Sequence, residues 1–237
     1  MPNLAIVGYG KMGRLIEQFA PEYGFTVALK RDLEPLVAQD FRGIDVAVDF
    51  TMPEAVRPNV ETIAAFGVNL VIGTTGWLEH IDAVKCAVEK HGIGLVWSPN
   101  YSVGVNAFFH LVSEAARLLA AEPEYGAWAW EIHHAAKKDR LSGTLLKLVD
   151  DMKKAGYARP IDLGSNRAGT IPGTHEIGFD SSADTITLRH TARSREGFAR
   201  GALKAAQWII GKKGFHEFGE VLSGASNGRG SVIEPRS

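Results

Sequence analysis

The segment EIHHAAKKDRLSGT, from Glu131 to Thr144, gathers side chains that can move a proton. His133 and His134 are adjacent, and a histidine can deliver a proton near neutral pH. Lys137 follows, and a lysine can pair with a carboxylate or polarise an imine. The segment therefore predicts acid-base chemistry on a small substrate. For the paired histidines alone, the competing interpretation is a solvated polar loop.

The same segment ends in residues that can hold an anion. Ser142, Gly143 and Thr144 precede a predicted helix. Amides at a helix N-terminus, together with hydroxyl groups, bind carboxylates. The alternative is that Ser142 only caps the helix. The pattern favours a carboxylated substrate held close to the histidines.

A metal site is the other chemistry that two histidines suggest. Adjacent histidines project differently, and no Cys, Asp or Glu lies at a familiar ligand spacing from them. We therefore predict no metal ligands in this segment.

The glycines of GYGKMG have the spacing of a dinucleotide-binding loop. Gly8, Gly10 and Gly13 lie between a predicted strand and a predicted helix. Glycine permits the tight turn, the close approach of a pyrophosphate and the close packing of the helix. A glycine-rich turn with no ligand is the alternative. The position near the start of the chain favours dinucleotide binding.

Two cations follow the second predicted strand. Lys30 and Arg31 stand where NAD-binding sites carry an acidic residue for the ribose hydroxyl. Cations suit a 2'-phosphate, so NADPH is expected to be preferred, with NADH possible. A solvated pair of surface charges is the alternative, and Asp32 follows immediately.

Small polar loops follow three more strands. They are DFT with Phe50, GTTGW with Gly73, Thr74 and Thr75, and SPNYS from Ser98 to Ser102. Ligands of doubly wound sheets lie beyond the carboxyl ends of the strands, so we expect one nucleotide cleft here. For GTTGW alone, a plain turn stabilised by threonine hydroxyls is an equal alternative.

The elements that position these loops alternate between strand and helix up to Ser98. Strands are predicted at Leu4–Val7, Phe25–Leu29, Val46–Phe50, Asn69–Ile72 and Gly94–Trp97, and helices at Lys11–Ala20, Ala55–Phe66 and His80–Lys90. This alternation indicates an α/β fold with an N-terminal Rossmann-like, doubly wound parallel sheet. The spacer from Arg31 to Asp45 is short and contains Pro35, so its helix should be reduced or lost.

The pattern changes after Ser98 to an α+β arrangement. We predict helices at Val103–Ala121, Thr144–Ala155 and Gly197–Ile210, strands at Gly126–Ile132, His175–Phe179 and Thr185–His190, and a short closing segment at Phe215–Leu222. Adjacent strands indicate a mixed or antiparallel sheet. We place a dinucleotide-binding domain at residues 1–102 plus 196–237 and a second domain at 103–195. The tail from Ser223 to Ser237 should be frayed.

The composition bounds the class of protein. The 237 residues are 45% hydrophobic and 22% charged, with a formal net charge of -1. Such a balance attracts neither nucleic acid nor an anionic membrane, so the expected partner is a small molecule. The one cysteine, Cys86, cannot form an intrachain disulfide, and the first residues do not resemble a secretion signal. We expect a cytoplasmic protein.

Together, these motifs resemble the dihydrodipicolinate reductases, also described as 4-hydroxy-tetrahydrodipicolinate reductases, of the diaminopimelate and lysine pathway. The likeness covers nearly the whole chain. Its motifs, in the family's order, are GYGKMGR, DFTMPEA, GTTGW, SPNYSVGVN, EIHHAAKKDRLSGT, RAGTIPGTHEIGF and HTARSREGFARGALKAA. The pattern HH-x-x-K-x-D-x-x-SGT is close to diagnostic.

The resemblance implies roles for individual residues. His133 would be the catalytic acid and Lys137 its partner, with His134 at the substrate and with Gly143 and Thr144, next to Ser142, gripping a carboxylate. The second domain would bind substrate and form a homotetramer. With the residues above, the predicted cofactor-binding set is Gly8, Gly10, Lys11, Met12, Gly13, Lys30, Arg31, Phe50, Gly73, Thr74, Thr75, Ser98, Asn100 and Tyr101.

The chain departs from the family just before SGT. Arg140 and Leu141 replace the usual Ala-Pro, which removes a φ-restricted residue and adds a cation near the predicted carboxylate site. The segment between the second and third strands is also shorter than in many relatives.

The expected activity is NAD(P)H-dependent reduction of 4-hydroxy-tetrahydrodipicolinate, a small dicarboxylate, to tetrahydrodipicolinate. Two alternatives remain: another two-domain nicotinamide oxidoreductase, such as an amino-acid dehydrogenase, and a non-catalytic protein that senses NADPH. The sequence leaves open whether His133 or Lys137 is the proximate proton donor.

Overall fold

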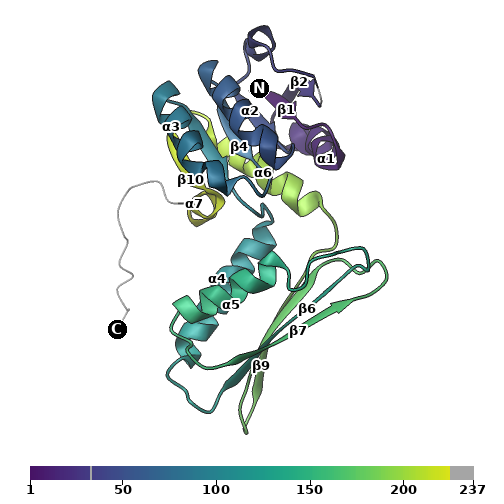
Figure 1. The fold of residues 1–237 in the computed structure, drawn as a ribbon, viewed down its shortest axis with the longest axis vertical. Coiled ribbons are helices and arrows are strands. Elements are labelled where there is room, and N and C mark those ends of the chain that lie inside the picture. The colour runs from purple at the N-terminus through teal and green to yellow at the C-terminus, as the bar shows by residue number, and fades with distance from the viewer. Residues whose placement is uncertain (33, 225–237) are drawn as a thin grey trace, which may run out of the picture. The chain divides into compact units, whose positions relative to one another are not determined.

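The computed structural model describes residues 1–32 and 34–224. Contacts divide the chain into two compact units: unit 1, Met1–Tyr101 with Ala199–Ser237, and unit 2, Ser102–Phe198 (Figure 1). The chain therefore leaves unit 1 for unit 2 and then returns. The predicted frayed tail lies, from residue 225 onward, outside the described residues.

Unit 1 is built on a six-stranded parallel sheet with the strand order β10-β5-β4-β3-β1-β2. The strands are β1 (Asn3–Val7), β2 (Thr26–Arg31), β3 (Val46–Asp49), β4 (Asn69–Ile72), β5 (Gly94–Trp97) and β10 (Gly214–Glu217). The chain first adds β2 on one side of β1 and then adds β3 to β5 on the other. The strand order thus reverses between β1 and β3, and ligands bind at such switch points in doubly wound sheets.

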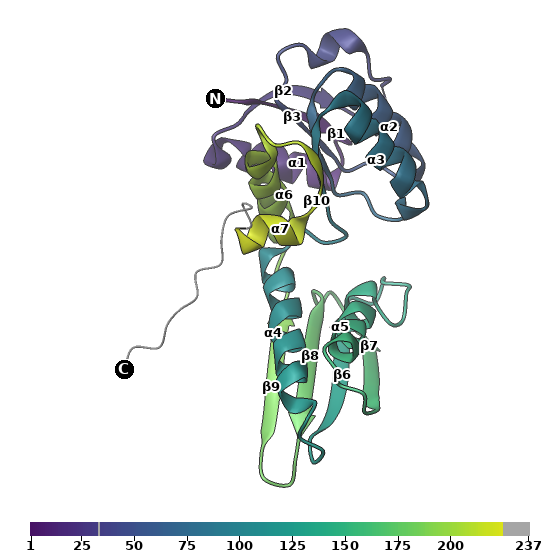
Figure 2. The ribbon, with the colours of Figure 1, turned by 90° about the vertical axis from the view of Figure 1, so that its left-hand side faces the viewer.

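Helices cover both faces of this sheet, as Figure 2 shows. One face packs against α1 (Lys11–Phe19), the part of α6 (Glu196–Ile209) from Ala199 onward, and α7 (Phe218–Ser223). The other packs against α2 (Pro53–Ala65) and α3 (Ile81–His91). Alternate residues of one strand supply both cores: Leu4 and Ile6 face α1, while Ala5 and Val7 face α2. This burial on both faces explains the continuous apolar runs of the sequence.

The Rossmann-like sheet is confirmed, with one correction. The segment predicted only as a short closing piece contains β10, which pairs in parallel with β5 and completes the sheet. In the described residues of the spacer after β2, the structure has the 3-10 turn η2 (Ala38–Phe41) and no α-helix, in line with the expected reduction. Two further 3-10 turns, η1 (Ala20–Tyr23) and η3 (Leu78–His80), adjoin α1 and α3.

Unit 2 is a four-stranded mixed sheet in the order β7-β6-β8-β9 with helices on one face. Its elements are α4 (Val103–Leu119), β6 (Gly126–His133), α5 (Gly143–Lys154), β7 (Ile161–Arg167), β8 (Thr174–Asp180) and β9 (Thr185–Thr191). β7 runs parallel to β6, and the other pairs are antiparallel. The mixed sheet is confirmed, although the sequence analysis missed β7.

The pleat of β6 decides which side chains point toward the helices. Ala129 belongs to the core under α4 and α5, and alternation places Glu131 and His133 on the same face. Trp128 and Trp130 therefore point to the opposite face. The helix-covered face of the sheet thus changes from apolar to ionisable toward the C-terminal end of β6.

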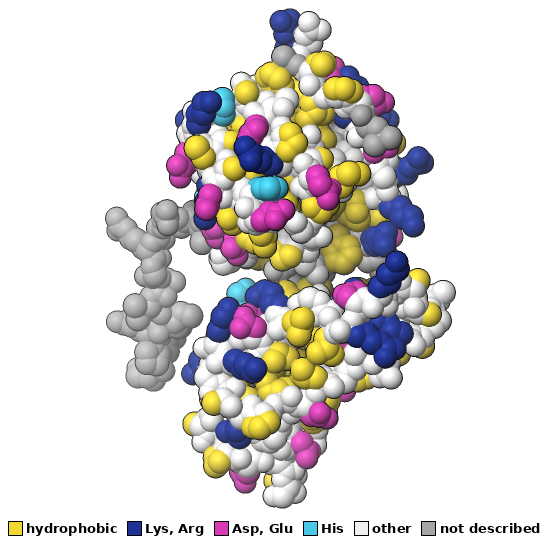
Figure 3. Space-filling view, viewed as in Figure 1, with side chains coloured by type: hydrophobic (Ala, Val, Ile, Leu, Met, Phe, Trp, Pro, Cys, Tyr) yellow, Lys and Arg dark blue, Asp and Glu magenta, His cyan; other side chains and the backbone are white. Residues whose placement is uncertain are grey.

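No helix in the described part of the chain is long and apolar enough to cross a membrane. On the face drawn in Figure 3, Lys and Arg side chains are interspersed with Asp and Glu over both units.

Candidate active site

The three glycines of the GYGKMG loop have different surroundings. Gly8 has a left-handed φ of +89°, and a Cβ there would lie 2.3 Å from the carbonyl oxygen of Phe50. A Cβ on Gly13 would lie 2.5 Å from the carbonyl oxygen of Gly8. A Cβ on Gly10 would meet nothing within 4 Å. The fold therefore requires the first and third glycines, whereas the second leaves open space where a pyrophosphate approaches such loops.

A pocket of about 470 Å³ lies at the N-terminus of α1. Its size falls within the range of small-ligand sites. The residues lining it are Gly10, Lys11, Met12, Phe50, Thr51, Pro53, Gly73, Thr74 and Thr75. All except Thr51 and Pro53 belong to the predicted cofactor-binding set. Gly10, the N-cap of α1, supplies no capping side chain, so first-turn amides can bind an anion. The pocket therefore fits the phosphate end of a dinucleotide.

A buried carboxylate, which the sequence analysis missed, holds the polar loops after β3 and β4 together. Asp49 is fully buried and accepts hydrogen bonds from Thr51 Oγ1 at 2.7 Å, Thr74 Oγ1 at 2.9 Å and Asn59 Nδ2 at 2.8 Å. Burial raises the pKa of Asp49, and these hydrogen bonds oppose the rise. The hydroxyl of Thr74 is thus engaged within the protein. An acidic residue ending the apolar strand VAVD was the available signal.

Other residues of the predicted cofactor-binding set differ in how far their side chains are engaged within the protein. Phe50 lies against Gly73, where a Cβ would come within 2.1 Å of the ring. Ser98 and Asn100 bond to each other through the Ser98 hydroxyl, which donates at 2.8 Å and accepts at 3.1 Å. Tyr101 is buried, and its hydroxyl bonds to the carbonyl oxygens of Ile72 and Val96 at 3.0 Å. The Tyr101 hydroxyl is therefore engaged within the protein.

Each of the two cations after β2 has an acidic partner. Lys30 Nζ lies 2.9 Å from Glu17 Oε1, and Arg31 Nη2 lies 2.7 Å from Asp40 Oδ2. Asp32 accepts the backbone N–H of Tyr9, in the glycine loop, at 3.0 Å. A 2'-phosphate would therefore compete with acidic groups for these cations.

In unit 2 the predicted acid-base residues differ in burial and in their contacts. His133 ends β6 and is 9% exposed, whereas His134, one residue beyond the strand, is exposed. Lys137 forms an ion pair with Asp139, with 2.8 Å between Nζ and Oδ1. Burial lowers the pKa of His133, and the charge of Lys137 lowers it further. His133 and Lys137 are thus electrostatic neighbours, while His134 faces away from the core.

The predicted carboxylate grip lies at the start of α5. Ser142 is the N-cap, and its Oγ accepts the backbone N–H of Leu145 at 3.2 Å. Gly143 and Thr144 occupy the first two helical positions, whose amides have no partner within a helix. The preceding Arg140–Leu141 peptide bond is cis. The capping role and the anion-binding role of this segment are therefore compatible.

The centre of unit 2's polar cluster is Glu131, which is fully buried. Its Oε1 accepts hydrogen bonds from Arg167 Nη2 at 2.9 Å, Ser165 Oγ at 2.8 Å and the backbone N–H of Ser142 at 3.1 Å. The side chain of Arg167 is 5% exposed, so this is a buried ion pair. No role was predicted for Glu131, Ser165 or Arg167 from the sequence, although Glu131 begins the segment singled out there.

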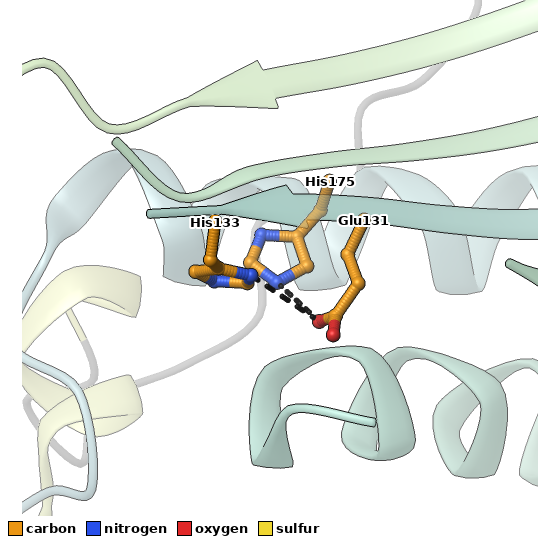
Figure 4. A group of neighbouring side chains, drawn as sticks. All are labelled: Glu131, His133 and His175. Carbon is orange, nitrogen blue, oxygen red and sulfur yellow. Dashed lines mark ion pairs between the residues drawn. The ribbon is translucent and has the colours of Figure 1, made fainter. Parts of the chain in front are cut away.

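Two imidazoles face the other oxygen of this carboxylate, as Figure 4 shows. Glu131 Oε2 lies 3.7 Å from His133 Nδ1 and 3.5 Å from His175 Nε2. The two rings are 5.1 Å apart, edge to face. His175 Nε2 also contacts the Ser142 hydroxyl at 3.1 Å. The cluster thus links the end of β6 to the start of α5.

Burial and charge together set the protonation of this cluster. Burial raises the pKa of Glu131, but hydrogen bonds from Ser142, Ser165 and Arg167 outweigh it and hold the pKa at about 2. Burial lowers the pKa of His133 below 6.5 and that of His175 to about 4, although Glu131 opposes both shifts. At neutral pH the cluster therefore holds a carboxylate, a guanidinium and two neutral imidazoles.

Glu131, His133 and His175 each offer one ligand atom, all within 4.8 Å of one another. A divalent ion could bridge such a spacing, whereas the sequence analysis predicted no metal ligands. The guanidinium of Arg167, 2.9 Å from the carboxylate, repels a cation there. The charges therefore favour a proton-holding cluster over a metal centre.

A parallel sheet with a glycine loop at its switch point, joined to a mixed-sheet unit with an acid-base cluster, defines the class of dinucleotide-dependent oxidoreductases. The family model "Dihydrodipicolinate reductase, N-terminus" matches residues 20–101, and "Dihydrodipicolinate reductase, C-terminus" matches residues 104–222. The chain belongs to the dihydrodipicolinate reductase family, which confirms the resemblance noted from its motifs.

Relatives support this assignment along most of the chain. The 4-hydroxy-tetrahydrodipicolinate reductase of Christiangramia forsetii is 35% identical over 93% of this chain and 98% of its own. That of Methanosarcina mazei is 36% identical over 94% and 89%. A dipicolinate-bound dihydrodipicolinate reductase from a Paenisporosarcina species shares the fold, with a TM-score of 0.78 at 20% identity over 93% of this chain and 99% of its own.

Likeness of fold identifies the family less specifically than these sequence matches do. An amine dehydrogenase from Mycobacterium smegmatis has a TM-score of 0.61 at 10% identity, over 90% of this chain and 93% of its own. The fold is thus shared with an enzyme of a different named activity. The family is decided by the sequence matches.

Proposed function

We propose that this chain reduces 4-hydroxy-tetrahydrodipicolinate to tetrahydrodipicolinate with NADPH, in diaminopimelate and lysine biosynthesis. Membership of the reductase family supports the reaction. The observation that carries the assignment of residues is the cluster around Glu131, because this carboxylate lies beside His133 and also accepts a hydrogen bond from Ser142 at the helix N-terminus. A proton-transfer group and an anion-binding group are thereby held next to each other.

Unit 1 is assigned the cofactor. The first-turn amides of α1 would hold the pyrophosphate over Gly10, and Phe50 with Gly73 would line the pocket farther along. Asp49 accepts hydrogen bonds from the loops after β3 and β4, which would help to hold the pocket in shape for the cofactor. The bound nicotinamide supplies the hydride.

Unit 2 is assigned the proton and the carboxylates. Gly143 and Thr144 would bind one carboxylate through amides of α5. His133 or Lys137 adds the proton, directly or through water. His133 is neutral near pH 7 without substrate because burial lowers its pKa. A dianionic substrate adds negative charge close to the imidazole, which favours its protonated form when proton transfer is needed.

We assign the NADPH preference to Arg31, with Lys30 in support. Both cations lie at the end of β2, where the ribose of a dinucleotide binds. Asp32 follows them and is fixed by the Tyr9 amide, so it offers an acceptor to the ribose hydroxyl of NADH. NADH is therefore expected to bind as well, but less tightly than NADPH.

We also propose that the chain forms a homotetramer through unit 2 and works in a reducing, cytoplasmic setting. Within the described part of the chain, the sheet of unit 2 carries helices on one face only, and its other face presents Trp128 and Trp130. The ring of Trp128 covers Gly178, where a Cβ would come within 2.0 Å of it. Flat aromatic side chains of this kind suit an interface. The exposed free thiol of Cys86 suits a reducing compartment.

NADPH oxidation with the product of dihydrodipicolinate synthase as substrate tests the reaction. Wild type is expected to consume NADPH, while His133→Ala and Lys137→Ala lower kcat by about 100-fold, a typical contribution of acid-base catalysis. Oxidation absent in the wild type would refute the assigned substrate. Full activity of both variants would refute the assigned residues alone.

The same experiment separates the alternatives. Another dehydrogenase would turn over a different substrate and would not be inhibited by dipicolinate. A sensor would bind NADPH tightly and turn over neither substrate.

A further inference from the structure

The strands of unit 2 align four polar residues in one row across the sheet. Glu131 on β6 pairs with Ser165 on β7 and with His175 on β8, and His175 pairs with His190 on β9. The neighbouring row is apolar, because Ala129 pairs with Ile177 and Ile177 with Leu188 in the helix-covered core. The polar row therefore marks the edge of the core at which the predicted site begins.

Within this row the two carboxylate oxygens of Glu131 have different neighbours. Oε1 is occupied by Arg167, Ser165 and the Ser142 amide, while Oε2 points to the imidazoles (Figure 4). The positive charge of Arg167 thus lies on the side of Oε1. Oε2 remains the nearest negative group to the His133 ring, at 3.7 Å from Nδ1.

His133 Nδ1 is buried and has no hydrogen-bond partner among the described residues. At 3.7 Å the carboxylate is too far for a hydrogen bond but close enough for a strong charge interaction. The charged or titratable groups facing His133 from the surrounding elements are Glu131, Arg167, His175, Lys137 and Asp139. Of these, Glu131 is both negative and fully buried, so solvent screens its charge least.

The second role of the carboxylate concerns the start of α5. Glu131 accepts the backbone N–H of the N-cap, Ser142, at 3.1 and 3.2 Å to its two oxygens. This bond fixes where the helix begins, and therefore where the amides of Gly143 and Thr144 point. The same side chain thus sets both halves of the predicted substrate site.

We propose that Glu131 is a positioning residue for the reduction: it holds the N-terminus of α5 in place for the substrate carboxylate and keeps a fixed negative charge beside His133. This rests on the proposed function for its kinetic consequences. The carboxylate touches neither substrate nor cofactor and acts through Ser142 and His133. Its loss should weaken dicarboxylate binding and make His133 harder to protonate.

Glu131→Gln is the main variant, in the full-length protein. Kd for dipicolinate should rise about tenfold or more, and kcat should fall about tenfold or more, as expected when one partner of a buried charge pair is removed. Activity that needs protonated His133 declines as pH rises through its pKa. Without the negative charge this decline should move about half a pH unit or more toward lower pH. Kd for NADPH should change less than about twofold.

Glu176→Gln is the matched control, because Glu176 neighbours His175 on β8 but lies on the other face and pairs with Arg189 at 3.5 Å. It should leave every readout unchanged. Glu131→Asp keeps the charge but is one methylene shorter, so it should restore the pH profile and leave dipicolinate binding weak. A merely structural role would move all readouts of the two Glu131 variants together.

Ser165→Ala keeps the carboxylate and removes one of its hydrogen bonds, which keeps the test open if Glu131→Gln does not fold. It should weaken dipicolinate binding about threefold, the cost of one hydrogen bond, without moving the pH profile. The proposal is overturned if every Glu131 variant that folds has the dipicolinate affinity and the pH profile of the wild type. If only Ser165→Ala folds, an unchanged dipicolinate affinity in that variant overturns it.

An NMR titration of the His133 ring in wild type and Glu131→Asp or Glu131→Gln separates this proposal from the proposed function. The pKa of His133 should be lower in Glu131→Gln than in the wild type or Glu131→Asp, whether or not the protein turns over the substrate. A wild type without turnover refutes the function, whereas an unshifted His133 titration in Glu131→Gln refutes the role of the charge.

Discussion

Alanine substitutions at Gly10 and Gly13 separate a cofactor-binding loop from a plain glycine turn. The two glycines lie three residues apart in the same loop, yet an added methyl group meets different surroundings. At Gly13 it lies 2.5 Å from the Gly8 carbonyl oxygen and 3.2 Å from Ile6 Cγ2. At Gly10 it meets nothing within 4 Å. Gly13→Ala therefore strains the protein, while Gly10→Ala fills only the open space where the pyrophosphate is expected to bind.

The expected magnitudes follow from these distances. Gly13→Ala must push α1 away from the turn, and such overpacking costs about 1–3 kcal/mol of unfolding free energy. Gly10 has φ -80°, which alanine tolerates, so Gly10→Ala loses only N-cap preference, about 1 kcal/mol or less. If a pyrophosphate lies over Gly10, the methyl group displaces it. A rise of about tenfold or more in Kd for NADPH, or about 1.4 kcal/mol, is then expected.

Urea unfolding and NADPH binding, followed by fluorescence, measure the two effects on the same samples. Gly10→Ala should keep its stability and lose affinity. Gly13→Ala should show mainly a lower free energy of unfolding. Wild-type affinity in a folded Gly10→Ala protein would refute the placement of the pyrophosphate and favour a glycine turn without a ligand.

Three further predictions concern the other parts of the molecule. Arg31→Ala should raise KM for NADPH about tenfold and leave KM for NADH nearly unchanged; an equal change in both would exclude a 2'-phosphate contact. Glu131 has its pKa lowered from 4.5 to about 2, so it stabilises the fold above pH 4.5 by about 3 kcal/mol and loses this as pH falls toward 2. Relative to Glu131→Gln, the wild type should lose about 2 kcal/mol between about pH 6 and pH 3 in urea unfolding, and a constant difference would contradict the lowered pKa. Trp128→Arg should convert the proposed tetramer to a smaller species in light scattering, whereas an unchanged mass would place the interface elsewhere.

The sequence was most informative where local pattern and burial coincide. The strands around Leu4 and Val48 are buried on both faces, so their apolar runs were visible without any partner. Edge strands gave less signal. β7 has the sequence IDLGSNR, in which small and polar residues interrupt the apolar ones. Its pairing with β6 follows from the crossover through α5 rather than from its own composition. β10 is short and joins the sheet only through β5.

Part of the site was visible from the sequence, whereas the buried residues that support it were not. His133, Lys137 and Ser142 lie within one segment, so their types and spacing suggested chemistry. Arg167, 36 residues after Glu131, reaches that carboxylate only because β7 lies beside β6 in a fixed register. No local pattern encodes such a contact. Buried charge partners of a site are therefore the residues that a reading of one sequence tends to leave out.

The departure at Arg140 and Leu141 sharpens the role of the buried carboxylate. Leu141 packs against the core of unit 2, and Arg140 is exposed, so neither side chain occupies the start of α5. A proline before the SGT motif would restrict the backbone by its ring. This chain lacks that restraint, and the hydrogen bond from Ser142 to Glu131 is then a principal tie on the helix N-terminus. Introducing Leu141→Pro should therefore lessen the effect of Glu131→Gln on dipicolinate binding while leaving its effect on the pH profile intact.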